Sequence, residues 1–122
     1  MSLSKKIMIV DDSRIVHKRM AELLLDSDFE IVCFCRSGEE AVERYQEYRP
    51  DVVTMDIVMP GADGLNAARE IMEMDHDARI LMVSSLAYDD LVDEAVKIGA
   101  KGFVFKPFDR MQLLSSLSCA LK

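Results

Sequence analysis

Short apolar runs alternate along the chain with longer stretches in which apolar and polar residues mix. The runs span residues 7–10, 31–35, 52–55, 80–83 and 103–105 and are rich in Ile, Val, Phe and Met. Asp, Gly, Ser or Pro bounds them, and this pattern is typical of buried parallel β-strands.

Between the runs, apolar residues recur every three or four positions, so each stretch predicts a helix with one apolar face. Ser37 and Asp109 are N-cap residue types ahead of two of these stretches, and Gly99 follows the fourth, where a helix-ending glycine belongs. The apolar stripes are Val16, Met20, Leu23 and Leu24; Ala41, Val42, Tyr45 and Tyr48; Leu65, Ala68 and Met72; Leu91, Val92, Ala95 and Val96; and Leu114, Leu117 and Leu121.

Strict alternation of five strands and five helices predicts an α/β fold, a doubly wound parallel sheet with right-handed crossovers and helices on both faces. The length of 122 residues suits one domain, residues 1–122, with a single core. In open sheets of this kind, ligands bind beyond the C-terminal ends of the strands.

The charge balance narrows the range of partners. A net charge of −7 repels phosphate backbones, so direct nucleic-acid binding is not expected. The apolar runs fall far short of the roughly 18 residues that a membrane helix needs. Because no secretory signal is visible either, we expect a cytoplasmic protein without membrane attachment.

The three cysteines, Cys33, Cys35 and Cys119, predict reduced thiols, because an odd count in an acidic chain fits the cytosol. We expect all three to pack in the core as small apolar side chains. Cys33 and Cys35 stand two apart on a predicted strand and share a face, with side chains too far apart for an easy disulfide.

Four of the five predicted strands bring a polar or charged residue to the same edge of the sheet. Asp11 and Asp12 follow the first strand, Asp56 the third, Ser84 the fourth and Lys106 the fifth. Taken singly, an Asp-Asp pair is more often a turn or cap, a serine a loop residue and a Lys-Pro step plain surface. Their joint placement at one edge predicts a functional site.

These residue types suit phosphoryl transfer. Three crowded carboxylates repel one another and favour a cation, and hard oxygen ligands with open positions suit Mg²⁺ shared with phosphate. Lys106 supplies a positive charge for phosphate oxygens, and Ser84 supplies a hydroxyl donor. Asp56 can act as the nucleophile that forms an aspartyl-phosphate. The other groups would position the phosphoryl group and neutralise its charge.

Five segments match one protein family in order and spacing: residues 10–13 (VDDS), 51–56 (DVVTMD), 59–64 (MPGADG), 82–85 (MVSS) and 102–108 (GFVFKPF). Over essentially its whole length, the chain resembles the receiver domain of bacterial two-component response regulators. Residues 51–60 and the closing Lys106-Pro107-Phe108 are most similar to single-domain chemotaxis regulators. The resemblance implies a flavodoxin-like three-layer fold with strand order 2-1-3-4-5 and a cis Lys106–Pro107 peptide.

The resemblance also implies a phosphorelay switch that is not an enzyme. Asp56 would accept a phosphoryl group from a phosphohistidine on a sensor histidine kinase, and Lys106 would pair with a phosphate oxygen. Mg²⁺ would bind Asp12, Asp56 and the backbone carbonyl of Val58 directly, and Asp11 through water.

Two switch residues follow from the same resemblance. Ser84 would move to hydrogen-bond the phosphate, and Phe103 would turn inward behind it. These movements would change the face formed by residues 88–101 and 103–114, which a downstream protein or output domain would recognise.

The chain departs from the family pattern at the switch and beside the acceptor. Phe103 stands where the family often carries Tyr, so the ring has no hydroxyl. Val58 and Leu86, two residues after Asp56 and Ser84, are apolar and cannot readily position an attacking water, which predicts slow self-dephosphorylation. His17 and His76 fit ordinary helix-surface or loop positions.

Three other functions are compatible with parts of this pattern. An aspartyl phosphatase or mutase needs a second carboxylate where Val58 stands, and a flavodoxin-like flavin-binding module needs a phosphate loop where Asp11 and Asp12 would repel phosphate. A receiver module from a larger regulator, with a DNA-binding or enzymatic output domain, stays open.

Overall fold

The computed structural model describes residues 4–59, 63–86 and 88–122. Strands and helices alternate as the sequence predicts. Residues 60–62 of the predicted motif at 59–64 lie outside the described residues. The strands are β1 (Lys5–Val10), β2 (Phe29–Cys35), β3 (Val52–Asp56), β4 (Ile80–Ser84) and β5 (Gly102–Phe105); the helices are α1 (Arg14–Leu23), α2 (Gly38–Tyr48), α3 (Gly64–Met74), α4 (Asp89–Ile98) and α5 (Arg110–Ala120).

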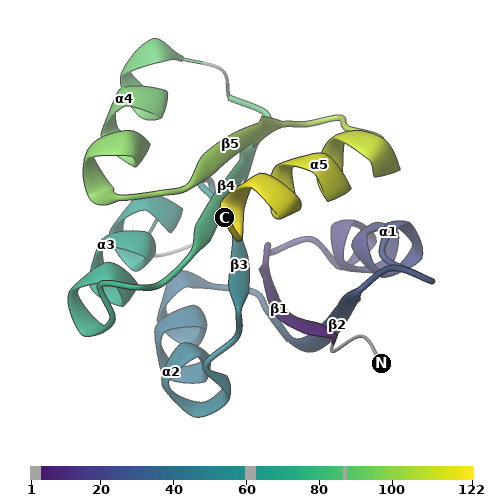
Figure 1. The fold of residues 1–122 in the computed structure, drawn as a ribbon. Helices are drawn as coiled ribbons and strands as arrows, with labels where there is room; N and C mark the ends of the chain where they lie inside the picture. Colours follow the sequence, from purple (N-terminus) through teal and green to yellow (C-terminus); the bar gives the residue numbers. More distant parts are fainter. Residues whose placement is uncertain (1–3, 60–62, 87) are drawn as a thin grey trace.

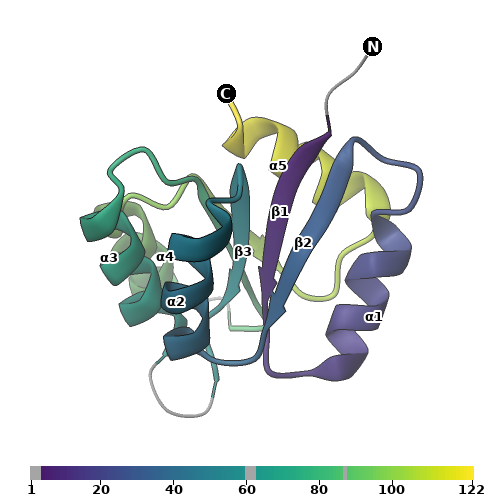
Figure 2. The same cartoon turned by 90° about the horizontal axis from the view of Figure 1, so that it is seen from below.

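The five strands form one parallel sheet in the order β2-β1-β3-β4-β5, which confirms the predicted doubly wound α/β fold. Helices α2, α3 and α4 cover one face of the sheet, and α1 and α5 cover the other (Figure 1). The view turned by 90° shows the same three layers (Figure 2). Because β1 and β3 are neighbours, with Val10 paired to Met55, the residues that follow these strands lie side by side.

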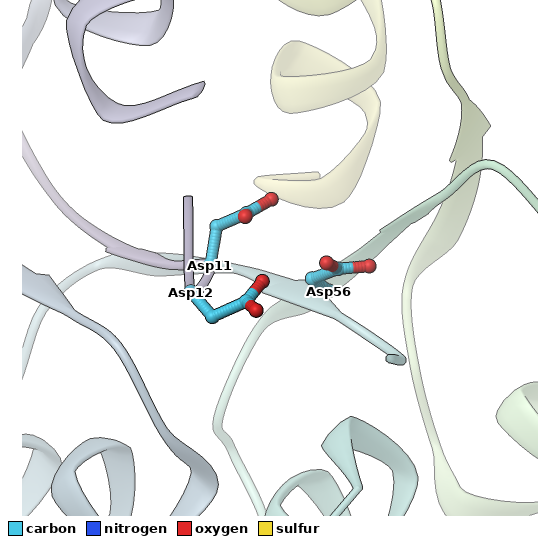
Figure 3. Close-up of side chains that lie close together, drawn as sticks. All are labelled: Asp11, Asp12 and Asp56. Carbon is cyan, nitrogen blue, oxygen red and sulfur yellow. The ribbon is translucent and has the colours of Figure 1, made fainter. Parts of the chain in front are cut away.

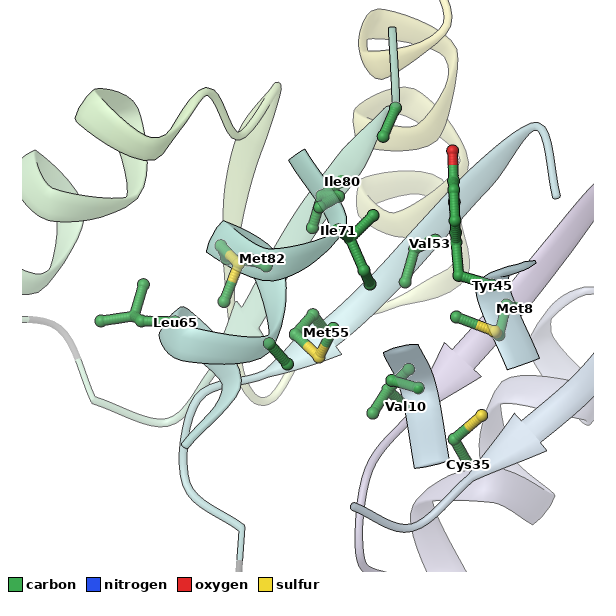
Figure 4. Packing of buried hydrophobic residues seen from close by; sticks show 14 of the residues in the cluster. Met8, Val10, Cys35, Tyr45, Val53, Met55, Leu65, Ile71, Ile80 and Met82 are labelled. Carbon is green, nitrogen blue, oxygen red and sulfur yellow. The ribbon is translucent and has the colours of Figure 1, made fainter. Parts of the chain in front are cut away.

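Each face of the sheet has its own apolar cluster, because successive side chains of a strand point to opposite faces. Met8, Met55 and Met82 face the α2, α3 and α4 layer, where Ile71 and Tyr45 pack on them (Figure 4). On the opposite face, strand residues such as Ile9 and Leu81 pack against side chains of α1 and α5. The central strands are therefore buried on both sides, as their continuous apolar runs predict.

The caps follow the sequence. The Ser37 hydroxyl accepts a hydrogen bond from the Glu40 backbone N–H, and Asp109 forms a capping box with Gln112. Gly99 ends α4 with φ 109°, a left-handed conformation that favours glycine. The Lys106–Pro107 peptide is cis, as the family resemblance implies.

Three predicted apolar stripes need correction. Tyr48, predicted on the apolar face of α2, is 41% exposed. Val96 of α4 is 67% exposed, so only Ala95 of that helix is buried. In α5 the buried residues are Leu113, Leu117 and Ala120, while the predicted Leu114 and Leu121 are only half-buried. Where neighbouring helix residues are all apolar, the sequence pattern can place the buried face one residue away from its actual position.

The cysteines also differ from expectation. Cys35 is buried and Cys33 half-buried, but Cys119 is exposed on α5, so core packing is wrong for Cys119. All three are free thiols, and the Cys33 and Cys35 sulfurs lie 3.8 Å apart, closer than their spacing suggested. Two residues along a strand span only about 6.6 Å, so side chains on one face can tilt into contact.

Candidate functional site

Three carboxylates meet at the C-terminal edge of the sheet, where the sequence places them. Asp11 and Asp12 directly follow β1, and Asp56 ends the neighbouring β3. One carboxylate oxygen from each residue lies within 4.8 Å of the others (Figure 3). Asp11 and Asp56 are buried and Asp12 is half-buried, so their mutual repulsion is poorly screened by water.

Lys106 partly compensates this charge. Its Nζ lies 2.7 Å from Asp11 Oδ2 and 3.4 Å from Asp56 Oδ2. The Lys106 backbone N–H donates to the Ser84 carbonyl at 2.9 Å, which extends the β4–β5 pairing up to the site. Burial alone would lower the pKa of Lys106, but its hydrogen bond to Asp11 and the charges of Asp56 and Asp11 outweigh burial and raise it.

In Asp56, unlike in Lys106, burial decides the direction of the pKa shift. Burial raises the pKa of its carboxyl group, and the charge of Asp11 raises it further. Lys106 and the Val58 backbone N–H act to lower that pKa, but they do not cancel the effect of burial. The Asp56 carboxylate is thus held at a free-energy cost, and an additional cation at this edge would relieve that cost.

The loop that carries Asp11 is held from several directions. Asp11 Oδ1 accepts from the Ser13 backbone N–H at 2.9 Å, and Ser13 in turn caps α1. The Asp11 backbone N–H donates to the Cys35 carbonyl at 2.9 Å. His17 Nε2 lies 2.6 Å from the Asp11 carbonyl, which can only accept, so the imidazole donates.

His17 is therefore a residue that sequence reasoning missed. The sequence predicted a helix-surface or loop position for it, yet it is half-buried. Its imidazole is hydrogen-bonded to the Asp11 carbonyl and contacts the Phe34 ring, with ring centroids 4.9 Å apart. Its position six residues after Asp11, one turn into α1, is the only signal the sequence offers. His76 is exposed, as expected.

Gly64 is a second missed residue. A Cβ at this position would lie 1.8 Å from the Asp56 backbone carbonyl oxygen, which no real side chain can do. The Gly64 backbone N–H also donates to the Ile57 carbonyl at 2.8 Å. Gly64 thus lets the start of α3 pack directly against the backbone of the acceptor residue.

The two predicted switch residues, Ser84 and Phe103, lie on the neighbouring strands β4 and β5. Ser84 is fully buried at the end of β4, and its hydroxyl accepts from the Leu86 backbone N–H at 3.0 Å. Phe103 is half-buried in β5 and packs against the cluster beneath α4. Its ring also contacts that of Phe105, with centroids 5.0 Å apart.

The oxygen donors fit a hard divalent cation. Three carboxylates with one lysine leave a net negative site, and Mg²⁺ prefers such oxygen ligands while keeping open positions for phosphate. Val58 follows Asp56 by two residues and is 57% exposed. Among the residues that the structure describes, this is the one cluster of three or more potential metal-ligating side chains.

Known proteins are similar to this chain in fold and in sequence. Residues 7–118 match the response regulator receiver domain. The chemotaxis protein CheY of Listeria monocytogenes is 42% identical over 96% of this chain and 98% of that protein, and CheY of Bacillus subtilis is 39% identical over 98% and 99%. A chain in the crystal structure of the CheX-CheY-BeF3-Mg+2 complex from Borrelia burgdorferi superposes with a TM-score of 0.94 at 35% identity, covering 98% of this chain and 91% of that one.

The chain belongs to the response regulator receiver domain family. Within that family it is similar to curated chemotaxis proteins named CheY, as the segment around Asp56 and the closing Lys106-Pro107-Phe108 predict. Receiver domains of this kind transduce signals and are not metabolic enzymes. Within the described ranges, no helix combines the length and apolarity needed to cross a membrane.

Proposed function

We propose that this protein is a phosphorelay switch in which Asp56 accepts a phosphoryl group from a sensor histidine kinase in a Mg²⁺-dependent reaction. The observation that carries the proposal is the position of Lys106, whose Nζ contacts both Asp11 and Asp56. A carboxylate nucleophile, further acidic ligands and a cation for phosphate oxygens suit phosphoryl transfer, which depends on positioning and charge neutralisation.

Each residue of the site has a role in this proposal. Asp12, Asp56 and the Val58 backbone carbonyl would hold Mg²⁺ directly, and Asp11 would hold it through water. Bound there, Mg²⁺ would neutralise the carboxylates and the phosphate oxygens. Lys106, which now pairs with Asp11 at 2.7 Å, would instead pair with a phosphate oxygen.

The phosphorylated site would be read through Ser84 and Phe103. The Ser84 hydroxyl can still donate while it accepts from Leu86, so it can bond to a phosphate oxygen. Phe103 lines two hollows of about 410 Å³ and 200 Å³ on the β5 surface, so open space borders this residue.

Helix α4 is the element most easily moved by such a change. It alone among the five described helices lacks a side-chain N-cap hydrogen bond, and it buries only Ala95. A helix with few buried contacts and no cap belongs to the low-stability part of a fold. We infer that α4, β5 and α5 form the face that a downstream protein recognises.

The partners follow from the same reasoning. A sensor histidine kinase would be the phosphodonor and a protein would read the output face; the Borrelia burgdorferi relative is named in a complex with CheX. The net charge of −7 argues against direct nucleic-acid contact.

We propose a single cytoplasmic domain over residues 1–122. The alternative of a receiver module within a larger regulator is tested by reading the coding sequence beyond Lys122.

Chemical mapping tests the proposal at the level of the residue. Incubation with acetyl phosphate and Mg²⁺ should add one phosphoryl group to the intact protein, and peptide mapping should place it on Asp56. A phosphoryl group on His17 or on any serine would contradict the proposed acceptor.

A further inference from the structure

Cys33 and Cys35 form a thiol pair that the proposed function does not use. Their sulfurs lie 3.8 Å apart on β2, an edge strand that pairs with β1 alone among the described strands. The Cys33 thiol also donates to the Phe34 carbonyl at 3.7 Å, so the proton shared between the two sulfurs belongs to Cys35. Cys33 is thus the acceptor of the pair and, being half-buried, the more accessible sulfur.

We propose that Cys33 and Cys35 form a reversible dithiol–disulfide pair whose closure weakens the neighbouring carboxylate site. Two residues along a strand span about 6.6 Å, within the upper range of Cα distances that a disulfide tolerates. The strand is already irregular here, because Ile7 pairs with Ile31 and Met8 with Cys33, which leaves Val32 as an extra residue. An edge strand with such an irregularity can deform without breaking a second ladder.

The oxidant is a peroxide, and the chemistry balances in two steps. The Cys33 sulfur attacks one peroxide oxygen, the O–O bond breaks, and the thiol proton leaves with the other oxygen as water, giving a sulfenic acid. The Cys35 sulfur then attacks the Cys33 sulfur, the S–O bond breaks, and the departing hydroxide takes the Cys35 proton to form a second water. Burial, and after it the neighbouring Cys33 thiol, raises the pKa of Cys35, which favours Cys33 as the thiol that reacts first.

Residues 33–35 help to hold the backbone of Asp11 in place. The Cys35 carbonyl accepts from the Asp11 N–H at 2.9 Å, and the Phe34 ring stacks on His17, which donates to the Asp11 carbonyl at 2.6 Å. We expect that drawing the two sulfurs together shifts Phe34 and the Cys35 carbonyl, whose contacts position Asp11. A soft metal ion is a weaker interpretation, because the described residues bring no third Cys, His, Asp or Glu to the sulfurs.

The first measurement concerns the bond itself and does not depend on the proposed function. Cys119→Ser provides a background without the exposed thiol, and Cys33→Ser and Cys35→Ser are added to it singly. Stoichiometric hydrogen peroxide should lower the intact mass of the background protein by about 2 Da, reversibly with dithiothreitol, and mapping should join Cys33 to Cys35. Oxidation to a sulfinic acid without a disulfide, or unchanged thiols, would overturn the inference.

The second measurement concerns coupling, which rests on the proposed Mg²⁺ site. The oxidised protein should bind Mg²⁺ roughly tenfold more weakly by calorimetry, at the low end of what outer partners contribute to metal sites. Hydrogen exchange at the Asp11 amide should also become faster. If the reduced protein binds no Mg²⁺, the proposed function fails, but hydrogen exchange at the Asp11 amide still tests whether disulfide formation affects the carboxylate site. Equal exchange at this amide in the reduced and oxidised proteins would overturn the coupling between the thiol pair and the site.

Discussion

Lys106 Nζ and Asp11 Oδ2 are joined by a 2.7 Å ion pair across 95 residues of sequence. The pair links the residue that follows β5 to the residue that follows β1, although neither strand is a neighbour of the other in the sheet. The Lys106 side chain is 22% exposed and the Asp11 side chain is 4% exposed, so water screens their attraction only in part. The site is therefore held together by charge before any ligand arrives.

Removing the lysine should cost stability through the carboxylates it leaves behind. We expect Lys106→Met to lower the free energy of unfolding by about 1–3 kcal/mol, below the full cost of breaking a buried pair because Lys106 is partly exposed. Adding Asp11→Asn should recover part of this loss in a double-mutant cycle measured by urea denaturation. Arg44→Met breaks an exposed ion pair with Glu47 and should change stability by no more than about 0.5 kcal/mol.

The raised pKa of Asp56 predicts a particular pH dependence. The folded protein binds the Asp56 proton more tightly than the unfolded chain does, so ionisation of this group opposes folding. Its destabilising effect is absent below the ordinary carboxyl pKa, about 4, grows between that pKa and the raised pKa of the folded state, and is complete above the raised pKa. Without Mg²⁺, Asp56→Asn should therefore be more stable than wild type at neutral pH, with a difference that vanishes in acid.

Mg²⁺ provides the control for that experiment. It should stabilise wild type, by about 2.7 kcal/mol at a hundredfold excess over its Kd, and should stabilise Asp56→Asn much less. A stability difference between the two proteins that is the same at every pH would contradict the account of Asp56.

Gly64 should tolerate no side chain. Gly64→Ala puts a Cβ 1.8 Å from the Asp56 carbonyl oxygen, so either α3 or the acceptor strand must move. We expect a loss of about 3 kcal/mol in denaturant unfolding, at the upper end of overpacking costs. Gly102→Ala is the matched control, since its Cβ meets only the Leu81 Cδ1 at 3.0 Å, and a similar loss there would refute the special role of Gly64.

Self-dephosphorylation should be slow and should respond to polarity at Val58. Val58 is 57% exposed and its side chain offers no hydrogen bond to water, so Val58→Gln should shorten the lifetime of the phosphorylated protein several-fold. Met111→Gln makes a comparable polar change on an 80% exposed residue and should leave the lifetime unchanged. A half-life of only seconds in the wild-type protein, followed by intact mass after donor removal, would count against this prediction.

The fold was predictable because its signals are local and repeated. The apolar runs, their spacing and the caps at Ser37 and Asp109 define the alternation of strands and helices, and alternation defines a parallel sheet. The stripe of α5 was misplaced because Leu113 and Leu114 are equally apolar, and only packing against the sheet decides between them.

The site was predictable only where strands deliver residues to the same edge. Asp11, Asp56 and Lys106 could be grouped because strand ends meet, and the structure places them in contact. The contacts of His17 and the close approach of Gly64 could not, because they depend on the angle at which α1 and α3 leave the sheet. No pattern of residue types encodes that angle.

Labelling by a small phosphodonor tests whether Asp56 is the Mg²⁺-dependent phosphoryl acceptor. Wild type, Asp56→Asn and the matched control Asp26→Asn are incubated with acetyl phosphate, with and without Mg²⁺, and followed by intact mass. Asp26 is exposed in a turn with φ 57°, a conformation that asparagine adopts readily. We expect labelling of wild type and Asp26→Asn only with Mg²⁺, and no labelling of Asp56→Asn. Labelling without Mg²⁺, or full labelling of Asp56→Asn, would contradict Mg²⁺-dependent phosphoryl acceptance by Asp56.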